Sequence, residues 1–130
     1  MRRRIKLAEL QLAIMQVLWD RGEAAVADVR EAIEPKHSVA HTTVATMLSR
    51  METAGHVTHR SEGRANVYRP KIRREDVGQS MVSDLADRMF QGDRAQLVAH
   101  LLAGEDITTD ELARLKKLVR DKEKELRDEQ

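Results

Sequence analysis

Residues 38–51 place apolar side chains at helical spacing on one side and short hydroxyl side chains on the other. With about 100° of rotation per residue, four apolar residues fall on one side of a helix: Val44, Met47, Leu48 and Met51. Five polar residues fall on the opposite side: Thr42, Thr43, Thr46, Ser49 and Arg50. Threonine is only a middling helix former, so this polar face gains little from helix propensity alone. The segment therefore predicts a helix that packs on a core through one face and meets a partner through the other.

Short polar side chains suit the DNA major groove, because they let a helix approach closely while offering hydrogen-bond donors and acceptors. Arg50 can contact a phosphate or bind guanine through two hydrogen bonds. The candidate DNA contacts on this helix are His41, Thr42, Thr43, Thr46 and Arg50. An ordinary solvated face is the alternative interpretation, and the neighbouring segments bear on the choice.

The two parts of the chain carry opposite charge, although the net charge of the whole is only +1. Residues 1–74 hold 14 Lys and Arg against 8 Asp and Glu, a net charge of +6. Residues 75–130 hold 9 Lys and Arg against 14 Asp and Glu, a net charge of −5. A basic part joined to an acidic part is typical of a polyanion-binding domain followed by a segment with another role. Ordinary charge variation among small domains is the alternative.

Two further helical patterns precede residues 38–51. The first, over residues 7–19, has a four-residue apolar stripe: Leu10, Ile14, Val17 and Leu18. The second, over residues 25–33, has three inward apolar residues: Val26, Val29 and Ile33. Gly22 is placed to cap the first helix, and Trp19 is predicted to anchor the core rather than to bind a ligand. Ser38 is expected to cap the third helix and Gly55 to close it.

A change of period follows the third helix. Residues 56–60 and 65–69 alternate in character and flank a turn segment, residues 61–64, that contains glycine. Three helices followed by a two-stranded hairpin is the element order of a winged helix-turn-helix, in which the hairpin is the wing. Arg60 and Arg64 would then lie on the wing, where they are expected to contact the DNA backbone or minor groove. The predicted fold class is mainly α with this small β wing.

From residue 74 the pattern is helical again, and three helices with apolar stripes are expected. Asp93 is placed to cap the second of them, and Thr108 with Glu111 has capping-box spacing at the start of the third. Fewer than 60 residues with almost no aromatic side chains cannot close a core of their own. Two chains are therefore expected to share this core, through contacts that include Leu85, Leu101, Leu112, Leu115 and Val119. The alternative is that the three helices fold back on the first part of the same chain.

The predicted domains are a winged-helix DNA-binding domain over residues 1–72 and a helical dimerisation domain over residues 73–130. The absence of cysteine excludes disulfides and thiolate metal sites. No apolar run approaches the roughly 20 residues needed to span a bilayer, so no membrane partner is expected. The basic residues 1–6 precede an amphipathic helix rather than the apolar block of a signal peptide. A cytoplasmic protein is expected.

The histidines do not form a recognisable catalytic or metal-binding pattern. His37 and His41 are four residues apart, but no third ligand is evident, so neither a metal nor a cofactor is predicted. His56 and His59 flank a strand and are expected at the surface near phosphate. His100 lies between apolar residues and is expected to be partly buried.

Three groups of residues resemble the BlaI/MecI/CopY penicillinase-repressor family over essentially the whole chain. They are Glu9-Leu10 with Val17-Leu18-Trp19, the segment 43–51, and a wing reading Glu62-Gly63-Arg64 followed by Val67-Tyr68 and Pro70. The resemblance implies a homodimeric winged-helix repressor that binds an inverted-repeat operator in double-stranded DNA. It also implies that Thr43, Thr46 and Arg50 meet DNA.

The same resemblance implies how repression is relieved. In the penicillinase-repressor branch a sensor-linked protease cuts an Asn-Phe bond in the short helix before the last one, and His100-Leu101 occupies that place here. The residue before the bond is not kept in kind. Family members often begin the recognition helix with Ser-Pro-Lys, whereas this chain has Ala40-His41-Thr42, so its base preference is expected to differ. The cysteine motif of the copper-responsive branch is absent, which rules out copper sensing through it.

Two other functions compete with a DNA-binding repressor. A winged-helix module could use the threonine face to bind a protein, in which case salt-dependent duplex binding would be absent. A small hydrolase or nuclease could use His41, His56 or His59, but these histidines lack partnered carboxylates. The charge division and the wing arginines favour the DNA-binding repressor, which would not be an enzyme.

Overall fold

A computed structural model describes residues 5 and 7–129 of the chain, so the basic residues 1–4 and 6 and the final residue lie outside the described residues. The chain divides into two compact units, Met1–Asp84 and Leu85–Gln130. We call the first unit the head and the second the C-terminal unit. Each is described by itself.

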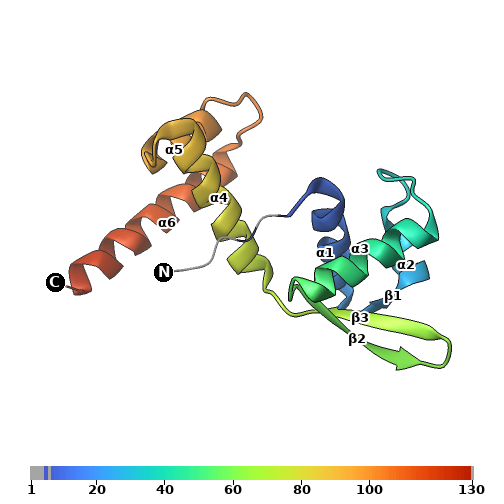
Figure 1. Ribbon diagram of the computed structural model, residues 1–130. Helices are drawn as coiled ribbons and strands as arrows, with labels where there is room; N and C mark the ends of the chain where they lie inside the picture. The colour runs from blue at the N-terminus through green and yellow to red at the C-terminus, as the bar shows by residue number, and fades with distance from the viewer. Residues whose placement is uncertain (1–4, 6, 130) are drawn as a thin grey trace. The chain divides into compact units, whose positions relative to one another are not determined.

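The head is a winged helix. Helices α1 (Glu9–Arg21), α2 (Val26–Ile33) and α3 (His41–Thr53) pack on a small antiparallel sheet (Figure 1). Its strands are β1 (Ala24–Ala25), β2 (Val57–Glu62) and β3 (Ala65–Pro70), in the order β1-β3-β2. The predicted fold class is confirmed. Strand β1 was not predicted, because two alanines are too short a segment to show an alternating pattern.

The core of the head gathers the apolar stripes of all three helices against Val57 and Tyr68 of the hairpin. Ile14, Leu18 and Val29 are fully buried, as their spacing predicts, and Met15 joins them although the sequence stripe omitted it. Trp19 is partly buried against this core, which confirms its predicted role as an anchor. Its indole Nε1 donates a hydrogen bond to the carbonyl of Ile72 at 2.9 Å, so the polar edge of the ring is also satisfied.

The start of α3 differs from the prediction. The N-cap residue is Ala40 rather than Ser38, and no side chain caps the helix. The carbonyl of Val39 accepts a hydrogen bond from Arg30 Nε at 3.0 Å, and the Val39 side chain packs against the core. Because this carbonyl and side chain are committed to contacts outside the helix, the chain stays extended until Ala40 and α3 begins two residues later than a Ser38 cap requires.

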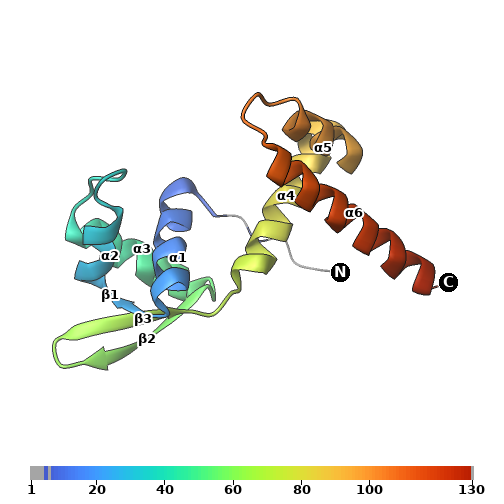
Figure 2. The same cartoon turned by 180° about the vertical axis from the view of Figure 1, so that it is seen from behind.

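The wing is formed by β2 and β3, which pair in register from Val57 opposite Pro70 to Glu62 opposite Ala65. Gly63 has a φ of 63°, a left-handed conformation that the tight turn requires and that glycine adopts without strain. Figure 2 shows the turn lying clear of the three helices of the head. The hairpin prediction is therefore confirmed, with each strand slightly longer than its sequence pattern indicated.

The C-terminal unit contains the end of α4 (Arg74–Phe90), all of α5 (Arg94–Leu102) and all of α6 (Thr109–Asp128). Asp93 caps α5 by accepting from the Gln96 N–H at 3.2 Å, and Thr108 with Glu111 forms a capping box at the start of α6. Both predicted caps are confirmed. No residue of α5 or α6 is buried within the described chain. None of the described helices has the length and apolar character that crossing a membrane requires.

Candidate nucleic-acid interface

The outer face of α3 is fully uncovered in the head. Val44, Leu48 and Met51 are 0% exposed, which fixes the orientation of the helix on the core. The opposite face then presents six exposed residues, namely His41, Thr42, Thr43, Thr46, Ser49 and Arg50. The predicted division of the helix into a core face and a polar outer face is confirmed, and all five candidate DNA contacts on this helix lie together on the outer side.

The first turn of α3 leaves backbone N–H groups available beside these side chains. The N–H groups of His41 and Thr42 lie in the first turn, where the helix itself provides no acceptor, and the N-cap residue Ala40 has no side chain that could accept from them. The positive end of the helix dipole lies next to them. The helix start and the side chains of its outer face therefore offer hydrogen-bond donors and a positive potential on the same side of the head.

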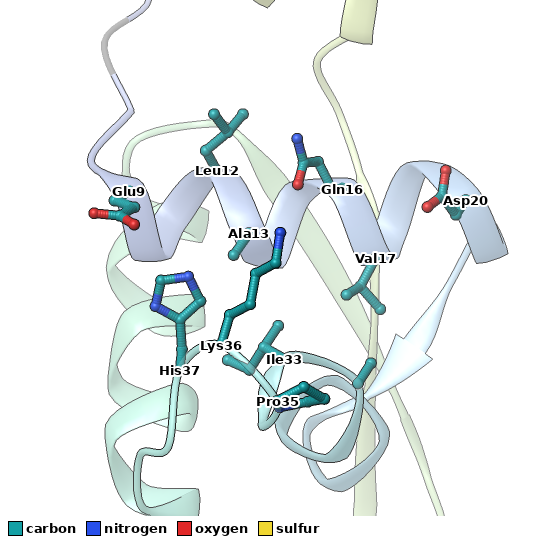
Figure 3. Close-up of a pocket in the computed structure, with 11 residues that line it drawn as sticks. Glu9, Leu12, Ala13, Gln16, Val17, Asp20, Ile33, Pro35, Lys36 and His37 are labelled. Carbon is teal, nitrogen blue, oxygen red and sulfur yellow. The ribbon is translucent and has the colours of Figure 1, made fainter.

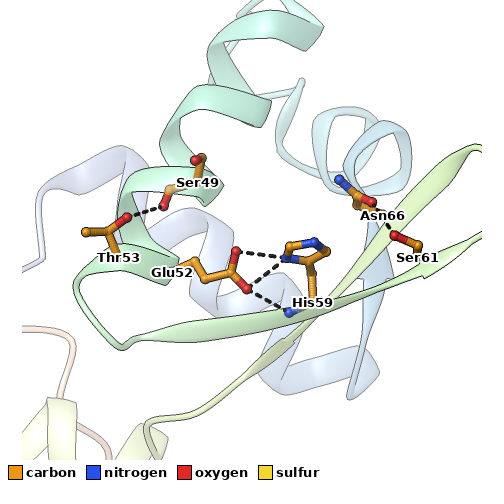
Figure 4. Close-up of polar contacts among 6 residues, drawn as sticks. All are labelled: Ser49, Glu52, Thr53, His59, Ser61 and Asn66. Atoms are coloured by element: carbon orange, nitrogen blue, oxygen red, sulfur yellow. Dashed lines mark hydrogen bonds and ion pairs between the residues drawn. The ribbon is translucent and has the colours of Figure 1, made fainter.

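The wing is attached to the end of α3 by an acidic side chain that the sequence did not single out. Glu52 Oε2 accepts a hydrogen bond from the backbone N–H of His59 at 3.0 Å, and both carboxylate oxygens lie 2.8 Å from His59 Nδ1 (Figure 4). The His59 ring packs on Tyr68 with 5.1 Å between centroids. Burial raises the pKa of the Tyr68 hydroxyl, and the nearby Glu52 charge raises it further.

The two faces of the wing differ because side chains alternate along a strand. His59 and Ser61 lie on the α3 side, where Ser61 Oγ contacts Asn66 Oδ1 at 3.4 Å. Arg60 lies on the other face, where its guanidinium binds both carboxylate oxygens of Glu23, at 2.9 and 2.7 Å, and one oxygen of Glu62 at 2.9 Å. The hydrogen bond from Arg60 lowers the pKa of Glu23, and Glu23 in turn raises the pKa of Arg60 above its already high value. Arg60 is thus bound to two carboxylates of the head at its surface.

Arg64 occupies the turn of the wing and is exposed. Within the described part of the chain, its side chain makes no ion pair or hydrogen bond, in contrast to Arg60. The sequence predicted that both Arg60 and Arg64 contact DNA. It did not single out Glu23 or Glu52, because pairing between residues 37 apart leaves no local signal and a lone glutamate on a helix looks like ordinary solvated surface.

His37 lies apart from the other histidines, in a groove of about 420 Å³ between α1 and the segment that joins α2 to α3 (Figure 3). Leu12, Val17 and Ile33 line this groove, and Glu9 and Lys36 stand at its edge. His37 precedes α3, so it does not share a helix face with His41. Among the described residues no cluster of three or more His, Asp or Glu is arranged to hold a metal ion.

The predicted dimerisation residues lie on α4, α5 and α6 and differ in exposure. Leu85, Leu101 and Val119 are 45%, 63% and 59% exposed, whereas Leu112 and Leu115 are partly buried. His100 is exposed, and its ring lies tilted against that of Phe90 with 4.9 Å between centroids, so the expectation that it is partly buried was wrong. The bond between His100 and Leu101, the predicted cleavage position, is at the surface of α5.

Comparison with known proteins agrees with this geometry. The penicillinase repressor family profile matches residues 7–121. The chain belongs to the penicillinase repressor family. A transcriptional regulator BlaI from Mycobacterium tuberculosis is 33% identical over 99 residues, covering 75% of this chain and 72% of the relative. The penicillinase repressor of Bacillus licheniformis is 24% identical over 110 residues, covering 85% and 86%.

The solution structure of the DNA-binding domain of the repressor BlaI superposes with a TM-score of 0.50 at 28% identity. It covers 58% of this chain and 93% of that domain, so the likeness is to a winged-helix domain. The relatives of this penicillinase-repressor family member are transcriptional regulators rather than enzymes, which confirms the prediction that the chain is not an enzyme. The suggested hydrolase or nuclease role for His41, His56 or His59 has no support from them. The expectation that these histidines lack a partnered carboxylate was nevertheless wrong for His59, which pairs with Glu52 because the wing folds back beside the end of α3.

Proposed function

We propose that this protein is a homodimeric transcriptional repressor that binds an inverted-repeat operator in duplex DNA. The observation that carries the proposal is the outer face of α3, where exposed hydroxyl side chains and Arg50 surround an uncapped helix start. In winged-helix domains the second helix of the turn pair enters the major groove, and short polar side chains there can reach base edges. Membership of a repressor family supports the same role.

Thr46 provides the sharpest test, because it lies at the middle of the exposed outer face. We expect Thr46→Ala to leave the melting temperature unchanged and to weaken binding to the preferred duplex by about tenfold, as one lost base contact does. The preferred duplex is obtained by selection from a random pool with the wild-type protein, and binding is measured by fluorescence anisotropy beside a scrambled duplex. Thr109→Ala in α6 is the matched control and should bind both duplexes as the wild type does. Equal weakening on both duplexes would remove Thr46 from sequence reading.

Assembly as a dimer is supported by the C-terminal unit, whose apolar stripes are left uncovered in a single chain. Leu101, Leu118 and Val119 are each more than half exposed, and no residue of α5 or α6 is buried within the described chain. Apolar side chains in such number are stabilised when a second surface removes them from water. Two heads held together bind two half-sites, and the second head then binds at a high effective concentration.

Release of the operator by proteolysis is the further part of the proposal. The bond between His100 and Leu101 lies in the nine-residue helix α5, near its end at Leu102. A cut there would separate α6 from the rest of the chain and remove its apolar stripe from the dimer. A sensor-linked protease is the proposed partner for this step.

A winged-helix module that binds protein instead of DNA is the competing function. The free Arg64 at the wing turn and the exposed donors at the start of α3 favour DNA, since both suit an anionic backbone. Duplex affinity that is independent of salt concentration would instead support the protein-binding module.

A further inference from the structure

Glu52 joins the proposed recognition helix to the wing at one point. It follows the buried Met51 at the end of α3, and its carboxylate receives both the backbone N–H and the ring Nδ1 of His59 (Figure 4). Strand β2 is at the edge of the sheet, so this N–H faces away from β3 and takes Glu52 as its acceptor. Through the His59 ring, which packs on Tyr68, the contact also reaches β3.

No other described residue replaces this contact farther out along the wing. The base of the hairpin is held by the His56 N–H, which donates to the Met51 carbonyl at 2.9 Å. Beyond His59, the described part of the wing makes no hydrogen bond to α3, and Arg60 is directed to Glu23 on the opposite face. Pairing of β3 with β1 and the buried Val57 and Tyr68 place the base of the wing on the head. The contact between Glu52 and His59 is the outermost one that ties the described wing to α3 itself.

A carboxylate at this position has a cost for a protein that binds DNA. Glu52 is the only acidic residue of α3, and its side chain is 31% exposed on the side where the helix meets the wing. A negative charge near the phosphate backbone weakens duplex binding of any sequence. The presence of Glu52 is explained if the wing position that it fixes strengthens operator binding by more than its negative charge weakens it.

We infer that Glu52 is a positioning residue for operator recognition. Glu52 hydrogen-bonds two nitrogen atoms of His59 and so holds the wing near the end of α3. The helix and the wing turn can then contact one half-site together. This inference rests on the proposed function of specific duplex binding. Glu52 itself need not touch DNA.

The chemistry of the contact predicts different results for two substitutions of Glu52. A carboxylate offers acceptors only, so it matches a His59 ring that carries a proton on Nδ1, whether the ring is neutral or protonated. In Glu52→Gln, the amide oxygen can keep the backbone N–H while the amide NH₂ faces Nδ1. That arrangement suits a neutral ring protonated on Nε2 and opposes a protonated ring, which has two donors. The titratable groups that contact the His59 ring are Glu52 on α3 and Tyr68 on β3.

The test uses the full chain and the duplex selected by the wild-type protein, with a scrambled duplex of the same composition. Glu52→Ala should bind the selected duplex about tenfold more weakly, the effect of losing a charged hydrogen bond, while its affinity for the scrambled duplex stays equal or rises. Glu31→Ala, which removes an exposed acid from α2, is the matched control. It should leave the ratio of the two affinities unchanged.

Glu52→Gln is the second variant and is compared with the wild type on both duplexes. Its affinity for the selected duplex should lie between those of the wild type and Glu52→Ala, because the amide oxygen can still accept from the backbone N–H of His59. Hydrogen exchange at the His59 amide measures the contact with Glu52 in the absence of DNA. Protection of this amide should fall in Glu52→Ala and recover partly in Glu52→Gln. An unchanged affinity ratio in Glu52→Ala, or unchanged protection of the His59 amide in that variant, would overturn the positioning role. A wild type that does not discriminate the two duplexes would overturn the proposed function and this inference together.

Discussion

Two arginines of the wing, four residues apart, have opposite surroundings. Arg60 is held by Glu23 and Glu62, whereas Arg64 at the turn is exposed and, among the described residues, unpaired. An arginine must be able to approach a phosphate to release a counterion from the duplex. Arg60 would first have to leave two carboxylates, so we expect Arg64 to contribute more to duplex binding than Arg60.

We expect Arg64→Ala to weaken binding to selected and scrambled duplexes alike and to reduce the slope of log affinity against log salt by about one. Arg60→Ala is the matched control and should change this slope much less. Anisotropy titrations at several salt concentrations measure both slopes. A slope that drops equally in the two variants would return Arg60 to the DNA contacts.

Residues of the site also show which of its features could be predicted from the sequence alone. The outer face of α3 was predictable because burial of Val44, Leu48 and Met51 follows directly from helical spacing. The pairing of Arg60 with Glu23 was not, since it depends on how β1 aligns beside β3 and brings together distant parts of the chain. The exposure of His100 was not predicted for a related reason. Apolar neighbours in the sequence do not bury a residue unless another element packs on them.

At the scale of single elements, caps and turns were predictable where the side chain acts locally. Asp93 and Thr108 cap α5 and α6 as their spacing indicates. Ser38 failed as a cap because tertiary contacts of Val39 hold the preceding segment extended. Helix boundaries were thus predictable from local capping residues, except where a contact with another element competed with the cap.

Helix α5 carries the prediction on how repression is relieved. His100 and Leu101 are exposed, but a folded helix resists proteases, so α5 must open locally before it is cut. We expect mass spectrometry of the repressor from induced cells to reveal fragments that end near His100, and uninduced cells to contain full-length chain. Full-length repressor at unchanged abundance while target genes are expressed would show that something other than cleavage releases the DNA.

At the scale of the whole molecule, the head and the C-terminal unit differ in how completely they are folded as single chains. The head buries a continuous core, whereas α5 and α6 have no buried residue within the described chain. The net charge of +6 over residues 1–74 and −5 over residues 75–130 suits the proposed roles, because a basic segment suits DNA and an acidic segment does not compete for it. Where the DNA-binding domain ends as an independent functional piece stays a prediction.

The dimer can be tested at Val119, which is 59% exposed and so contributes little to the packing of its own chain. A carboxylate at this position would be buried without a partner in a shared core, which costs several kcal/mol. We therefore expect Val119→Asp to sediment as a monomer while its head keeps the melting behaviour of the wild type. Ala113→Asp introduces the same charge elsewhere on exposed α6, away from the apolar stripe, and should remain dimeric.

Binding to the full inverted repeat should fall far more in Val119→Asp than binding to a single half-site, because only binding to the full repeat depends on effective concentration. A wild-type chain that sediments as a monomer at micromolar concentration would rule out the shared core and leave the exposed leucines of α5 and α6 to some other partner.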